Sequence, residues 1–165
     1  DVRSWPPAVM FGAGHGGIEA VILFGFGLIN VAVLVLGGDA LVAQAQAASP
    51  QQAEALRAQI QALQGTPVWA YGLGIYERVL AIVVHVAFSI MVMRAVRGDG
   101  AKWLLGAMAG HVALNTVAVL TVQNAGSVAA EAVLTVVALG CLAFIRAQRQ
   151  SAGSAQANPQ PNVVA

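Results

Sequence analysis

Charged residues are scarce in this chain of 165 residues, and cysteine is almost absent. Lysine, arginine, aspartate and glutamate together make up 9% of the sequence, whereas an ordinary soluble domain has about 25%. So few charges cannot cover the surface of a soluble protein of this length. A net charge of +1 without a basic patch excludes a nucleic-acid-binding protein. The single cysteine, Cys141, excludes a disulfide scaffold and a cysteine-based zinc site.

Apolar residues are abundant instead, at 58% of the chain, and the mean hydropathy is +0.74. Four apolar stretches approach or exceed the length of about 20 residues that a helix needs to cross a bilayer. These stretches are residues 7–36, 69–96, 102–122 and 127–145. The sequence therefore predicts an all-α, polytopic membrane helix bundle with four transmembrane helices in contact with the lipid bilayer.

Two of the connections between the spans are short, and one is long. The Gly-Asp-Gly sequence at 98–100 predicts a tight turn, so the second and third spans should run antiparallel. The connection at 37–67 contains a segment, 51–64, in which Leu56, Ile60 and Leu63 fall on one helical stripe. That pattern predicts a short amphipathic helix in the outer loop.

The sequence predicts two parts, a bundle domain at 1–149 and a disordered tail at 150–165, because residues after Arg149 are small and polar. The chain begins with Asp1 rather than methionine, so an N-terminal truncation is expected. Basic residues set the orientation, since Lys and Arg favour the cytoplasmic side. The 97–102 turn and the tail are predicted to be cytoplasmic and the 37–67 loop external, in a bacterial-type plasma membrane.

Several ionisable residues lie inside the predicted spans, where they are costly and become functional candidates. With a rise of about 1.5 Å per residue, His85 and His111 both lie roughly 13 Å from the cytoplasmic face, and Glu19 lies near that level. His15 precedes Glu19 by one helical turn, and Asn115 follows His111 by one turn. The glycines around His15 favour close helix packing in a membrane. Glu131 lies four residues into the last span and is expected to be solvated or to act as a helix N-terminal charge.

These groups support hydrolysis of a peptide bond. A buried carboxylate beside histidines can act as a general base, so Glu19 and His85 would activate water. His111 and Asn115 would stabilise the oxyanion. Zinc held by Glu19, His85 and His111 is a second route, and metal-free catalysis is favoured. The alternatives are a non-catalytic membrane scaffold and a proton- or ion-coupled transporter-like module.

Glu77 lies eight residues outward of His85 along the same span, about 12 Å away. Its neighbour Arg78 could pair with it or with Glu19, and a structural ion pair is the favoured interpretation.

The motif Gly14-His-Gly-Gly-Ile-Glu-Ala20, then Glu77-Arg78 with His85 beyond it, then His111-x-x-x-Asn115, resembles the YhfC-type intramembrane peptidases. These are relatives of the CAAX prenyl protease and bacteriocin-processing (CPBP) glutamic intramembrane proteases. The resemblance implies an intramembrane endopeptidase with a membrane-embedded peptide substrate. It implies that Glu19 is the catalytic glutamate, that His85 helps to activate water, and that His111 and Asn115 form the oxyanion pair.

The first motif of the wider family reads EExxxR, whereas here the acid is single and follows His15. Ala81 replaces the usual phenylalanine before His85. The resemblance therefore leaves open whether Glu19 or Glu77 is the base, and whether the enzyme is a glutamic protease or a metalloprotease. His15 and Arg78 are supporting candidates. Because family members usually have more spans, the resemblance also implies helices upstream of Asp1.

Overall fold

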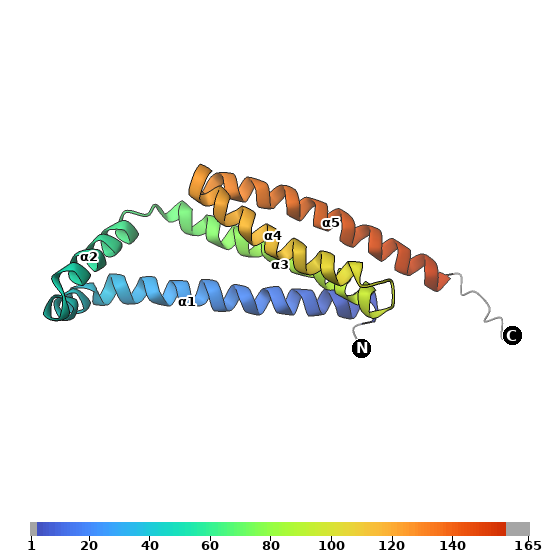
Figure 1. Cartoon of the computed structure of the whole chain (residues 1–165), viewed down its shortest axis with the longest axis horizontal. Coiled ribbons are helices and arrows are strands. Elements are labelled where there is room, and N and C mark those ends of the chain that lie inside the picture. Colours follow the sequence, from blue (N-terminus) through green and yellow to red (C-terminus); the bar gives the residue numbers. More distant parts are fainter. Residues whose placement is uncertain (1–2, 158–165) are drawn as a thin grey trace. The chain divides into compact units, whose positions relative to one another are not determined.

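The computed structural model describes residues 3–157, with side chains described through residue 151, and every regular element in that range is an α-helix. Figure 1 shows the five helices in chain order. Their bounds are α1 (Trp5–Ala48), α2 (Pro50–Gln64), α3 (Val68–Val96), α4 (Lys102–Ala125) and α5 (Ser127–Ala157). Four of them, α1, α3, α4 and α5, are long and apolar enough to cross a membrane. The predicted fold class, an all-α bundle with four spans and a short additional helix, is confirmed.

The chain divides into two compact units whose boundaries fall inside α1 and α3. The first unit comprises Asp1–Ile18 and Glu77–Ala165, and the second comprises Glu19–Tyr76. The first unit therefore contains the beginning of α1, most of α3, and all of α4 and α5. The second contains the rest of α1, α2 and the beginning of α3.

The core of the first unit forms where the beginning of α1 packs against α3. Ala8 on α1 is buried with Val86, Ile90 and Met93 on α3. Phe144 and Ile145 of α5 pack against this cluster. Most of the apolar side chains on α4 remain exposed, as expected for a helix that meets hydrocarbon rather than water. The histidine-bearing part of α3 is thus held on a packed surface.

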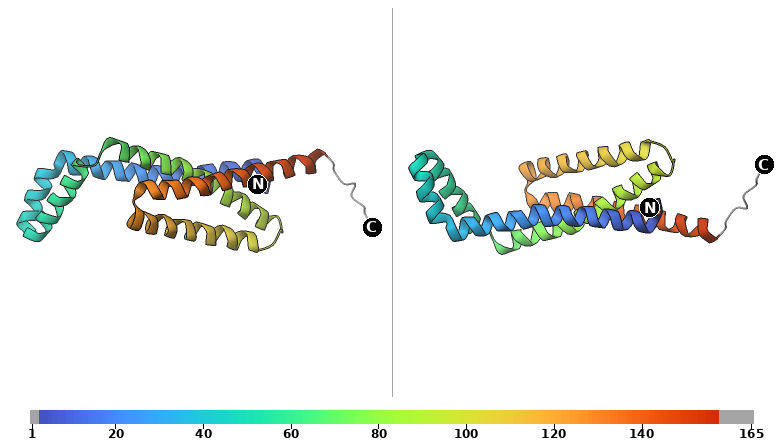
Figure 2. Two further views of the ribbon diagram at one scale, coloured as in Figure 1. Left: turned by 90° about the horizontal axis from the view of Figure 1, so that it is seen from above. Right: turned by 90° about the horizontal axis from the view of Figure 1, so that it is seen from below.

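Glycines make the two tight turns of the first unit. Gly98 and Gly100 have φ values of +96° and +103°, which side-chain-bearing residues rarely adopt. Gly126, at φ +86°, separates α4 from α5, and Figure 2 shows these two helices joined as a hairpin. The Gly-Asp-Gly turn predicted at 98–100 is therefore present.

In the second unit, the predicted amphipathic helix at 51–64 is present as α2. Its first residue is proline, a favourable first helical residue, and Ser49 precedes it in an extended conformation. The predicted stripe of Leu56, Ile60 and Leu63 is partly buried, and Ala53 on the same face is fully buried. The side chain of Ile60 lies against Gly38 of α1. The stripe therefore packs within the unit.

Two helix ends differ from the sequence-based expectation. The first span was expected to end near residue 36, but α1 continues through Gly37 and Gly38 to Ala48. The added segment is rich in alanine, the strongest helix former, and glycine at position 38 leaves room for Ile60. The second difference is at α5, which extends through Ala157 where a disordered tail was expected from residue 150. Residues 158–165 of that expected tail lie outside the described residues.

Candidate functional site

All three histidines of the chain meet in the first unit, one from each of three helices. His15 lies on α1, His85 on α3 and His111 on α4. The ring centroids of His15 and His85 are 5.1 Å apart, and those of His85 and His111 are 5.3 Å apart. A ligand nitrogen of His15 and one of His85 lie within 4.8 Å of each other. The similar depth deduced for His85 and His111 from helical rise therefore corresponds to direct ring contact.

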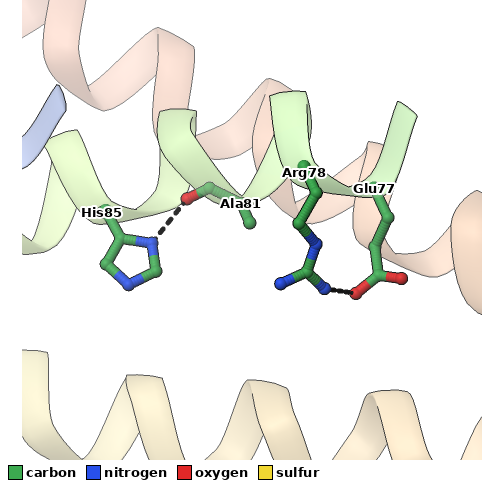
Figure 3. Close-up of polar contacts among 4 residues, drawn as sticks. All are labelled: Glu77, Arg78, Ala81 and His85. Carbon is green, nitrogen blue, oxygen red and sulfur yellow. Dashed lines mark hydrogen bonds and ion pairs between the residues drawn. The ribbon is translucent and has the colours of Figure 1, made fainter. Parts of the chain in front are cut away.

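His85 is the central member of this cluster and is buried, with 8% of its surface exposed. Its Nδ1 lies 2.8 Å from the backbone carbonyl oxygen of Ala81, one turn earlier on α3 (Figure 3). A carbonyl oxygen can only accept, so Nδ1 carries the proton and donates. In the tautomer with the proton on Nδ1, the ring lone pair lies on Nε2. This is how proteins usually fix the tautomer and orientation of a metal-binding histidine.

Two glycines of α1 allow that helix to approach α3 beside His85. A Cβ atom added at Gly12 would lie 2.5 Å from Cα of Val86 and 2.8 Å from the carbonyl oxygen of His85. A Cβ atom at Gly16 would lie 3.0 Å from Cα of Ile82 and 3.1 Å from Cβ of His85. Glycines four residues apart permit this kind of backbone approach in membrane helices. The expectation of tight packing is met at Gly12 and Gly16, which flank His15 in sequence.

The three histidines line a cavity of about 590 Å³. This volume lies within the range of about 300–1,000 Å³ that is typical of ligand-binding pockets. The rest of its wall is mostly apolar and includes Phe11, Phe88, Met108 and Val112, as well as the hydroxyl of Ser89. The His111 ring is also tilted against the ring of Phe88, with ring centroids 6.0 Å apart. The cavity is open on one side, and it presents imidazoles from a mostly apolar wall.

Glu19 lies on α1 four residues after His15 and is partly buried. Residues four apart on a helix occupy the same face one turn apart, so the carboxylate follows the imidazole along α1. Asn115 follows His111 by the same spacing on α4, and its side chain is exposed. Asn115 is not one of the described residues that line the histidine cavity.

Glu77 and Arg78 form an ion pair with each other, one of the two pairings considered from the sequence (Figure 3). Glu77 lines a different cavity, of about 300 Å³, together with Gln123 and Glu131. Glu131 was expected to be solvated or to act as a helix N-terminal charge, but it is buried at 8% exposure and shares this cavity with residues of α3 and α4. Its Oε2 atom has no hydrogen-bond partner within the described part of the chain.

His15 was a supporting candidate from the sequence, and the structure places its ring centroid 5.1 Å from that of His85. His15 precedes Glu19 by one helical turn, and two ligands at i and i+4 on one helix face are a known zinc-binding arrangement. The sequence alone did not indicate that His15 faces His85.

Comparison with known proteins gives one family. Residues 2–139 match the family model described as YhfC intramembrane metalloprotease. The curated protein described as "Uncharacterized membrane protein YhfC" from Bacillus subtilis (strain 168) is 30% identical over 118 residues. That alignment covers 72% of this chain and 46% of the relative, so the chain spans about half of the relative's length. No solved structure matches the chain.

Proposed function

The chain belongs to the YhfC intramembrane metalloprotease family, and we propose that it supplies the catalytic centre of a zinc-dependent protease acting on membrane-embedded peptide segments. The observation that carries the proposal is the meeting of His15, His85 and His111 at the wall of one apolar cavity. Ionisable residues are rare inside membrane spans, and three imidazoles in contact there need a functional reason.

We infer that His15, Glu19 and His85 would hold the metal. Their chemical types are those of zinc ligands, and they form a group that could hold a metal ion. His15 and Glu19 supply two ligands from one face of α1, and His85 supplies a third from α3 with its tautomer fixed by Ala81. Zinc, when bound, would supply Lewis acidity that makes water a nucleophile at neutral pH.

The remaining polar groups would handle protons and developing charge. Glu19 has two carboxylate oxygens, so one would bind the metal and the other would take the proton from the attacking water and return it to the leaving amine. His111, beside His85, can donate an N–H hydrogen bond to the oxyanion of the attacked carbonyl. Asn115, one turn further along α4, is the second candidate for that role.

The substrate class follows from the wall of the cavity. Phenylalanine, methionine and valine side chains around the histidines suit an apolar segment that enters from the bilayer. The basic residues at the α3–α4 turn support a cytoplasmic location for this end of the bundle, under the positive-inside rule. We therefore propose that the site faces the cytoplasmic half of the plasma membrane.

The test compares cells that express the chain with cells that express Glu19→Gln, which keeps the shape of the side chain and removes its basicity. New N-termini within membrane spans of the membrane proteome are the readout. We expect wild-type cells to produce cleavage products that the variant lacks. In isolated membranes, 1,10-phenanthroline should stop cleavage and added zinc should restore it. Glu77→Gln is the matched control and should retain cleavage.

Each of the other outcomes would contradict a different part of the proposal. Cleavage that survives the chelator but is lost in Glu19→Gln would favour the metal-free, glutamic mechanism. Cleavage that is lost in Glu77→Gln and retained in Glu19→Gln would make Glu77 the base. If cleavage products are the same with wild type and both variants, the protease proposal is wrong.

A further inference from the structure

A third cavity, of about 210 Å³ and with a mostly polar lining, lies at the end of the first unit where α1 begins and α3 ends. Its polar lining residues come from α1, the end of α3 with the turn that follows, and α5: Trp5, Arg94, Arg97, Asp99, Gln148 and Ser151. None of these residues belongs to the histidine cluster. The apolar side chain of Met93 closes the inner end, where the cavity borders the packed core.

The charge of this cavity favours an anion. Nε of Arg94 donates to Oδ2 of Asp99 at 2.8 Å, so one guanidinium and the single carboxylate of the lining already pair. Arg97 adds a second guanidinium, which leaves a net positive charge on the wall. Arg94 is further fixed by Trp103, since its guanidinium lies 3.9 Å from the centre of that ring. The guanidinium of Arg94 is therefore held in place by Asp99 and Trp103.

Trp5 provides a hydrogen-bond donor without an acceptor. Its Nε1 is buried and has no partner among the residues that the structure describes. A buried N–H group without an acceptor is rare in folded proteins, because its desolvation is not compensated. The indole ring has a neighbour on its face, the guanidinium of Arg149 at 5.7 Å. An acceptor bound in the cavity would satisfy Nε1.

We propose that this cavity binds the phosphate group of an anionic phospholipid. Phosphate oxygens accept from both a guanidinium and an indole N–H, which matches the donors on the wall. The location also fits, because tryptophan and arginine at the ends of spans lie at the level of lipid headgroups. A phosphate ion from the aqueous phase has the same chemistry and is the other source of such a ligand.

The experiment uses the full chain in a neutral detergent, titrated with phosphatidylglycerol, phosphatidylcholine or inorganic phosphate while thermal unfolding is followed. Phosphatidylglycerol should raise the midpoint of unfolding by mass action, and phosphatidylcholine should not. Arg97→Gln and Trp5→Phe should each weaken the apparent affinity for phosphatidylglycerol about ten-fold, the effect of losing one hydrogen bond to a charged group. Trp5→Phe keeps the ring beneath Arg149. Arg146→Gln is the matched control, a basic residue of α5 outside the lining set.

Three results would distinguish a phospholipid ligand from a free phosphate and from nonspecific binding. If only inorganic phosphate stabilises the chain, with the same dependence on Arg97 and Trp5, the cavity is an anion site whose ligand is a free phosphate and not a phospholipid. Equal stabilisation by phosphatidylglycerol and phosphatidylcholine would overturn the proposal. A loss of phosphatidylglycerol affinity in Arg146→Gln as large as that in Arg97→Gln would also overturn the proposal, because general attraction to a basic surface would then explain the binding.

Discussion

Replacing Gly12 by alanine should separate α1 from α3 and weaken metal binding. The added Cβ would lie 2.5 Å from Cα of Val86 and 2.8 Å from the carbonyl oxygen of His85, both backbone atoms that cannot rotate away. Ordinary carbon–carbon contacts are about 3.5–4.0 Å, so α1 must move by about 1 Å at this point. The same movement would carry His15 away from His85, whose ring centroids are 5.1 Å apart.

The expected cost can be estimated from two opposing effects. Overpacking of this size destabilises by about 1–3 kcal/mol. Alanine regains about 1 kcal/mol of helix propensity over glycine. The net destabilisation relative to the wild type should be about 0–2 kcal/mol, and the misplaced ligands should weaken zinc binding about ten-fold or more. Gly14→Ala is the matched control on the same helix, because a Cβ added there meets nothing within 4 Å.

The assay is thermal unfolding of the purified chain in detergent at increasing zinc concentration. Zinc should raise the unfolding midpoint of the wild type and of Gly14→Ala by similar amounts, since ligand binding stabilises the folded state. Gly12→Ala should start from a lower midpoint and need a higher zinc concentration for the same increase. If Gly12→Ala and Gly14→Ala behave alike in both respects, the glycine approach does not position the histidines.

Two further substitutions test the electrostatics of the bundle. Glu131→Gln should leave the free energy of unfolding unchanged or raise it by about 1 kcal/mol. The reason is that Oε2 lacks a partner among the described residues and that Glu77 lines the same cavity. A clear fall in the unfolding midpoint would show that the carboxylate has an essential partner. Arg94→Lys should lower the free energy of unfolding by about 1 kcal/mol, because lysine cannot keep both the planar contact with Trp103 and the hydrogen bond to Asp99. An unchanged midpoint of thermal unfolding in low salt would contradict this prediction.

The spans and turns were accessible from sequence because their causes are local. Length and hydropathy identify a membrane helix without reference to its neighbours. Glycine at 98 and 100 indicates a turn because few other residues adopt positive φ. The amphipathic stripe of α2 was visible for the same reason, since it repeats with the period of one helix.

The end of α1 could not be predicted from local sequence in this way. Gly37 and Gly38 together resemble a helix stop, yet the helix continues to Ala48. The difference depends on a tertiary contact, because Ile60 of α2 occupies the space that a side chain at 38 would fill. Propensity is a weak guide where such packing decides the outcome.

The candidate site was partly accessible. Helical rise placed His85 and His111 at one depth, and the rings do meet. Depth alone gives no rotation about the helix axis, so it could not show that His15 also faces His85. The same limit applies to Glu131, whose burial depends on the direction in which α4 and α5 face.

The most direct test of the proposed metal centre is the zinc content of the purified chain, measured by mass spectrometry of the metal after dialysis. We predict about one zinc ion per wild-type chain, and loss of that ion in His85→Ala and in His15→Ala. Glu77→Gln should retain it. A wild-type chain that binds no zinc at micromolar concentration, or histidine variants that bind as much zinc as the wild type, would contradict a metal site at this cluster.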